Sequence, residues 1–137
     1  MSIQTIITQV AALQAEITGV KRAHDETPDG LNEFPCFVNF ISTGDSDRSP
    51  NRRHVVHHIK MQLRVCRADR PSAENLVRPF LLRTYEKFDD NITLNGSATR
   101  SAIVHYDYGN LPWSGTNYLG ISFDLDVWED TAYAFSG

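Results

Sequence analysis

Three of the five histidines in this 137-residue chain fall within the segment RRHVVHHIK, at positions 52–60. Histidine is the commonest metal-ligating side chain, so His54, His57 and His58 are first considered as a metal site. The surrounding alternation is that of a β-strand, on which His54 and His58 share one face about 13 Å apart and His57 points to the other face. A zinc–nitrogen bond measures only about 2.0–2.1 Å. The spacing therefore predicts a half-exposed strand with one histidine turned inward, and no metal site.

Asp124 and Asp126 are the best candidates for catalysis. Alternate positions of a strand place both carboxylates on one face about 7 Å apart. That spacing suits an inverting hydrolase or a divalent-ion site, although both also require a cleft. Alternation with Phe123, Leu125 and Val127 explains the two aspartates equally well as the exposed side of a strand. The chain has no G-x-x-x-x-G-K-[ST], G-x-S-x-G or C-x-x-C motif, so we expect no catalytic residue, metal or cofactor.

The charged residues are segregated along the chain, although the formal net charge is only −4. From Arg48 to Lys87 there are ten basic and three acidic residues, whereas after Arg100 there are five acidic and no basic residues. Segments of opposite charge can pair within the fold or between copies of it, or they can form solvated faces of mixed sign. The basic residues are not interleaved with aromatic ones, so we expect no sequence-specific binding to nucleic acid.

The elements that position these residues follow from hydrophobic periodicity. Apolar residues at three- and four-residue steps predict a helix over residues 3–17. Residues 36–41 are predicted to form a strand, and period-two alternation predicts a long strand over 53–66. Between them, residues 42–51 are rich in Gly, Pro, Ser and Asp and predict a loop.

The second half repeats this order of elements. Residues 67–88 have a helical pattern that Pro79 should kink or split, because its ring removes a backbone donor and clashes with the preceding turn. Residues 102–108 and 118–128 alternate as strands, and the segment GNLPWSGTN between them predicts a turn region.

The order αββαββ predicts an α+β two-layer sandwich. We expect a mainly antiparallel four-stranded sheet, with two helices on one face and a long projecting hairpin loop. The length is that of one domain, assigned to residues 1–130, followed by an extended C-terminal tail over 131–137. Neither an apolar run of about 20 residues nor a basic region ahead of an apolar one is present, so we expect no membrane span, no signal peptide and synthesis in the cytoplasm.

Two segments carry a resemblance to a known family. In GVKRAHDETPDGLNEFPCFVNF (19–40) the first helix ends, and a loop passes through Leu31 and Pro35 into the first strand. In GNLPWSGTNYLGISFDLDVWED (109–130) an alternating strand follows Trp113 and Gly120. In these segments and in the order of its elements, the chain resembles the tail-terminator (tail-completion, or neck) proteins of long-tailed bacteriophages over about residues 1–130.

The resemblance implies a structural virion protein, synthesised in the host cytoplasm, whose subunits form a ring that is commonly a hexamer. Such a ring caps the finished tail tube, ends its polymerisation and joins the tail to the head connector. DNA passes through the lumen without sequence-specific binding. The resemblance implies no cofactor, catalytic residue or membrane. Alternatives are a head-side stopper or connector subunit, a soluble ligand-binding α+β domain, and a metal-dependent hydrolase that uses Asp124 and Asp126.

Candidate interface residues come from three segments: the 42–51 loop and its base, the 109–118 turn region, and the acidic face of the last strand. They are Asp45, Asp47, Arg48, Arg52, Arg53, Trp113, Tyr118, Asp124 and Asp126. The loop has a composition suited to ordering on a partner, or to remaining an idle loop. Trp113 and Tyr118 are aromatic residues of the kind that anchor interfaces, although packing within a hairpin explains Trp113 as well.

Overall fold

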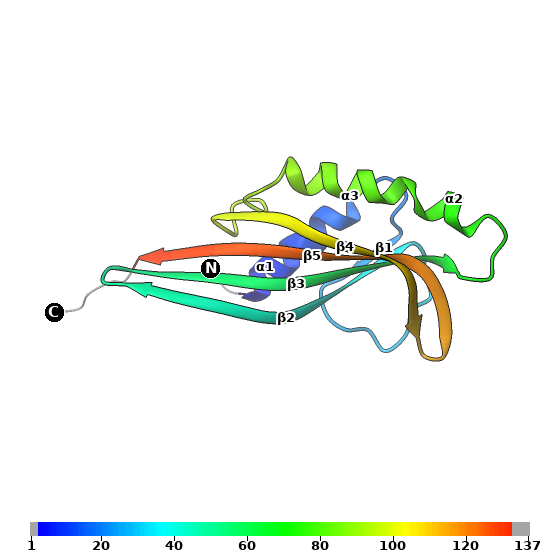
Figure 1. Ribbon diagram of the computed structural model, residues 1–137, viewed down its shortest axis with the longest axis horizontal. Helices are drawn as coiled ribbons and strands as arrows, with labels where there is room; N and C mark the ends of the chain where they lie inside the picture. The colour runs from blue at the N-terminus through cyan, green and yellow to red at the C-terminus, as the bar shows by residue number, and fades with distance from the viewer. Residues whose placement is uncertain (1–2, 133–137) are drawn as a thin grey trace.

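Five strands form one open sheet in the computed structural model, which describes residues 3–132 (Figure 1). The strands are β1 (Arg22–His24), β2 (Cys36–Ser49), β3 (Arg52–Arg67), β4 (Arg100–Trp113) and β5 (Thr116–Ala132). Their order across the sheet is β1-β2-β3-β5-β4. β1 runs parallel to β2, and the other neighbouring strands are antiparallel. The α+β class is confirmed, but the sheet is mixed and has five strands where four were predicted.

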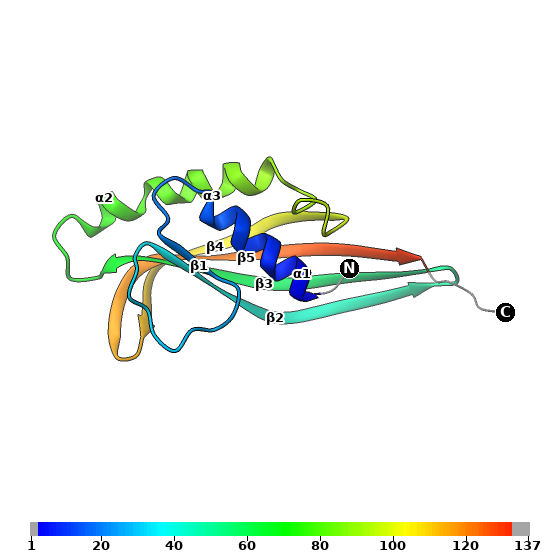
Figure 2. The same ribbon diagram turned by 180° about the vertical axis from the view of Figure 1, so that it is seen from behind.

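Three helices pack against one face of this sheet. They are α1 (Ile3–Ala15), α2 (Ala73–Val77) and α3 (Pro79–Asp89), and Figure 2 shows α1 crossing the sheet below α3. Pro79 divides the second helical segment as predicted, because proline cannot donate within a helix but fits the first turn of a new one. We call the covered side of the sheet the helix face and the opposite side the outer face.

The hydrophobic core lies between the helix face and the helices. The predicted apolar positions of the two long strands point into it: Ile59, Met61, Leu63, Val65, Ile121, Phe123, Leu125 and Val127. α1 contributes its predicted apolar stripe, including Ile6, Val10 and Leu13. One polar pair is buried beside the core, where the amides of Gln14 and Asn39 exchange hydrogen bonds of 2.6 and 2.7 Å. The helical periodicity of residues 3–17 and the strand alternation of β3 and β5 are therefore confirmed.

The prediction of a loop over residues 42–51 is wrong. β2 continues to Ser49, pairs with β3 from Thr43 onward, and leaves only Pro50 and Asn51 as the turn. A register shift between Ile41 and Thr43 accommodates the extra residue Ser42. Low strand propensity is overridden here because a full ladder of cross-strand pairs favours the extended conformation. Figure 1 shows the result, a paired hairpin that projects beyond the helices; we call residues 42–58 the projecting hairpin.

The predicted turn region 109–117 is also mostly strand. β4 continues to Trp113, and β5 begins at Thr116. The two strands are joined by Ser114 and Gly115, which both have positive φ, as a tight hairpin turn requires. Pro112 is tolerated because β4 is an edge strand. Figure 1 shows this hairpin bending away from the side of α3. We call residues 109–120 the curled hairpin.

Gly120 is the residue that permits this bend. A Cβ atom at this position would lie 1.9 Å from the carbonyl oxygen of Leu63 on β3. Only glycine allows the two backbones to approach so closely. The curled hairpin thereby covers part of the outer face.

The short strand β1 was missed because three residues carry no readable periodicity. Of the predicted tail, β5 includes residues 131 and 132, and residues 133–137 lie outside the described residues. Within residues 3–132, none of the helices has the length and apolar character needed to cross a membrane.

Candidate functional site

The basic side of β3 and the acidic side of β5 face one another on the outer face. The register opposes His54 to Asp130, His58 to Asp126, and Lys60 to Asp124. The joining distances are 2.7 Å from His54 Nδ1 to Asp130 Oδ1, 2.6 Å from His58 Nδ1 to Asp126 Oδ1, and 3.1 Å from Lys60 Nζ to Asp124 Oδ1. We call these six residues and Asp45 the polar ladder. Of the ten basic residues between Arg48 and Lys87, Lys60 pairs with the acidic segment along this ladder, and histidines form the other pairs of the ladder.

His58 is the branch point of the polar ladder. Its Nδ1 faces Asp126 on β5, and its Nε2 lies 2.9 Å from Asp45 Oδ2 on β2. Hydrogen bonds to Asp45 and then to Asp126 raise the pKa of His58, because both carboxylates favour the imidazolium. The carboxylates bind opposite nitrogens of the ring and do not converge on one point. Among the described residues, no group of three or more histidine, cysteine, aspartate or glutamate side chains could hold a metal ion.

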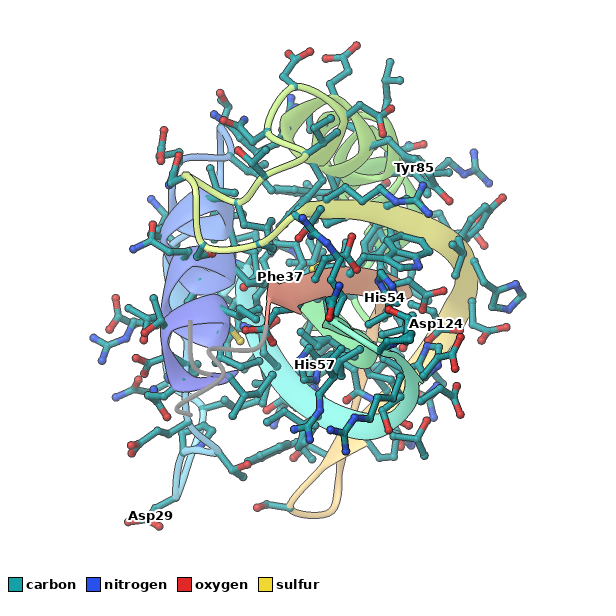
Figure 3. All side chains as sticks on the ribbon, turned by 90° about the vertical axis from the view of Figure 1, so that its left-hand side faces the viewer. Asp29, Phe37, His54, His57, Tyr85 and Asp124 are labelled. Carbon is teal, nitrogen blue, oxygen red and sulfur yellow. The ribbon has the colours of Figure 1, made fainter. Side chains whose placement is uncertain are left out.

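His57 lies on the helix face, as the alternation predicts. Its Nε2 is 3.0 Å from Oε2 of Glu129, which is buried beside it. Figure 3 looks along the strands and shows Phe37 on the side of α1 and Asp124 on the opposite side. The three histidines therefore belong to two different faces, and each pairs with carboxylates of its own: His54 with Asp130, His57 with Glu129, and His58 with Asp45 and Asp126.

Asp124 and Asp126 lie together in a shallow depression of about 310 Å³, lined also by Ser42, Lys60 and Val104. Each carboxylate is engaged by a basic partner from β3. Chemically, the arrangement places an imidazole between two carboxylates and an ammonium group beside a third. It explains both aspartates as the acidic half of a cross-strand ladder.

The other predicted interface residues lie at two separate ends of the molecule. Asp47, Arg48, Arg52 and Arg53 are exposed near the end of the projecting hairpin, where Asp47 Oδ1 accepts a 2.8 Å hydrogen bond from the backbone N–H of Arg48. Trp113 and Tyr118 belong to the curled hairpin. The nine predicted residues therefore form three groups and no single surface.

Trp113 and Tyr118 both pack within the fold. The Arg64 guanidinium lies 5.1 Å from the centroid of the Trp113 ring, and Tyr118 stacks on Phe34 with ring centroids 4.7 Å apart. Phe34 and Tyr118 also line a surface depression of about 580 Å³, together with Arg67 and Arg70.

Sequence reasoning missed two groups of residues. Arg64 occupies an exposed position of the β3 alternation, yet only 3% of its surface is exposed because the curled hairpin folds over it. Val104, Tyr106 and Tyr108 are exposed on the edge strand β4. For the second group, the alternation of residues 102–108 places Val104, Tyr106 and Tyr108 on one apolar face, and this face was the available signal.

No protein-family model matches the chain, and no curated protein matches it in sequence.

The polar ladder predicts a pH dependence of stability. The pKa of His58 is raised above 6.5 in the folded state, so its contribution is fully present below pH 6.5 and is lost as the pH rises through the folded pKa. We expect His58→Gln to lower the free energy of unfolding more at pH 6 than at pH 9, measured by urea denaturation. His105→Gln removes an imidazole from β4 and is the control. An equal loss for His58→Gln at both pH values would contradict the assignment.

Proposed function

We propose that the protein is a structural virion subunit that forms a ring on the end of a phage tail tube, ends tail polymerisation and joins the tail to the head connector. The observation that carries the proposal is that the sheet has two open edges. β4 is the last strand on one side. On the other side β1 covers only Cys36–Val38 of β2, and within residues 3–132 no strand pairs with that edge of residues 39–49.

Exposed apolar side chains accompany both edges. Ile41 on β2 is 54% exposed and Val104 on β4 is 56% exposed, and Tyr106 and Tyr108 are also exposed on β4, where Tyr106 meets Tyr85 of α3 edge to face. Natural proteins normally protect open edges with charges or cover, because such edges recruit further strands. Large exposed apolar residues at an open edge therefore favour an interface with another chain.

The strand directions favour a second copy of this chain as the neighbour. β2, β3, β5 and β4 alternate in direction, so β2 and β4 run in opposite directions. A copy placed beside the first in the same orientation brings its β2 antiparallel to β4 of the first, the more stable kind of pairing. This contact joins two different surfaces, and such contacts close into a ring when the rotation between copies allows. The ring, its hexameric number and its place on the tail come from the family resemblance.

The edge contact can be tested with Val104→Lys. A buried unpaired charge at an interface is costly, so we expect association to weaken by about ten-fold or more. Light scattering coupled to size exclusion, with negative-stain imaging, would show a ring-sized mass and an annular outline for the natural chain and a smaller species for the variant. Leu76→Lys is the matched control, because Leu76 is exposed on α2, which packs against the central strands β3 and β5. Equal association of all three chains would contradict the edge contact.

The position in the particle is tested separately. A terminator is expected on purified tails that lack heads, whereas a head-side stopper or connector subunit is expected on filled heads that lack tails.

The depression beside Phe34 and Tyr118 favours a soluble ligand-binding domain as the second candidate. That candidate is supported if the chain stays a monomer or dimer at all concentrations, with no annular particles.

A further inference from the structure

The curled hairpin encloses an arginine on the outer face. Arg64 Nε donates to the carbonyl oxygen of Leu111 at 3.3 Å, and its Nη2 donates to Pro112 O at 3.1 Å and to Gln62 Oε1 at 3.0 Å. The guanidinium lies over the ring of Trp113 at 5.1 Å from the centroid. The arginine is thus held at three of its donors by the hairpin and its own strand.

Two donors of this stacked pair have no acceptor. Arg64 Nη1 and Trp113 Nε1 are both buried, and neither forms a hydrogen bond within the part of the chain that the structure describes. Buried N–H groups in native proteins are nearly always hydrogen-bonded. Two orphaned donors side by side therefore point to an acceptor supplied by another molecule.

The charge of Arg64 is also unbalanced. All three of its acceptors are neutral carbonyl oxygens, and no carboxylate of the described residues forms an ion pair with it. Burial lowers the pKa of Arg64, and the groups that oppose this change are the Cys36 thiol and the Tyr118 phenol. Burial raises the pKa of Cys36 itself to about 11, so this thiol stays protonated at neutral pH. Buried charges in proteins are normally paired.

We propose that Arg64 and Trp113 form a binding site for one anionic oxygen, from an inorganic oxyanion or from a carboxylate. Such a ligand accepts from both orphaned donors and balances the guanidinium, whereas a water molecule would leave the charge unpaired. Because both donor atoms are buried, the curled hairpin must open to admit the ligand and then close again, which returns Trp113 to Arg64 and brings both donors to the anion. This inference is independent of the proposed function.

The site can be tested by fluorescence in the full chain. Trp113 and Trp128 are its two tryptophans, so Trp128→Phe leaves Trp113 as the single reporter. Phosphate and acetate are titrated against chloride at constant ionic strength, and the thermal midpoint is measured alongside the emission. We expect a saturable change with at least one of these anions, and a loss of apparent affinity of ten-fold or more in Arg64→Gln.

Arg100→Gln in the same Trp128→Phe background is the control, because it removes a guanidinium that in the natural chain lies over the other tryptophan, 4.0 Å from the centroid of Trp128. Its anion dependence should equal that of the parent chain. If Arg64→Gln fails to fold, Trp113→Phe replaces it, and its anion-dependent thermal shift should shrink. A carboxylate from a second copy would instead make the emission depend on protein concentration, and Arg64→Gln would abolish that dependence. The site is overturned if neither anion nor protein concentration changes the signal, or if Arg64→Gln leaves the response intact.

Discussion

Replacing Gly120 with alanine is expected to destabilise the fold by about 3 kcal/mol, at the upper end of what overpacking usually costs. The added Cβ would lie 1.9 Å from the carbonyl oxygen of Leu63, 2.9 Å from its carbonyl carbon and 3.2 Å from the Cα of Arg64. All three atoms belong to the backbone of β3, so no side chain can move aside. The strands must separate at this position, and the curled hairpin loses the bend that places it over Arg64.

Denaturant unfolding of Gly120→Ala measures this effect directly. Gly30→Ala is the matched control, because a Cβ at Gly30 meets no atom within 4 Å. Its free energy of unfolding should stay within about 0.5 kcal/mol of the natural chain. Similar stability of the two variants would show that β3 and β5 do not approach so closely at Gly120.

Truncating Phe123 to alanine is expected to lower the free energy of unfolding by about 3–5 kcal/mol. Phe123 is fully buried at the centre of β5, opposite Met61 on β3 and Tyr106 on β4. Its ring also meets Tyr85 of α3 edge to face at 6.0 Å between centroids. The cavity left behind would lie between the sheet and α3.

Two further variants serve as controls for the Phe123→Ala measurement. Phe123→Leu keeps most of the volume and should cost clearly less than the alanine variant. Leu82→Ala removes an exposed apolar side chain from α3 and should stay within about 0.5 kcal/mol. If Phe123→Ala costs no more than Leu82→Ala, the core does not have the packing described.

The parts of the fold that could be predicted are those in which burial repeats along the chain. The stripe of α1 and the alternation of β3 and β5 reflect faces that contact the core, so periodicity reveals them. The break at Pro79 follows from local covalent structure alone. Residues 42–49 and 109–113 escaped prediction because pairing with distant strands decides their conformation, against the propensity of their own glycines, serines and prolines.

The candidate site shows the same limit. Segregated charge indicated that basic and acidic segments could pair, and β3 and β5 do so. Which residues meet depends on the register of β3 against β5, and a two-residue shift of that register would separate His58 from Asp126. The alternation placed Arg64 on an exposed face. Its burial depends on a bend at Gly120, more than fifty positions later in the chain.

The projecting hairpin extends past the helices, and its residues 42–48 are exposed. Backbone hydrogen bonds and the polar ladder hold it there, without a layer of apolar side chains on both sides. Local opening of such a segment costs much less than unfolding of the whole domain. Amide protons should therefore exchange with solvent in a gradient, fastest near Pro50 and slowest where β3 and β5 pair through buried residues such as Met61 and Phe123. The projecting hairpin can therefore unfold and refold locally while the rest of the domain stays folded.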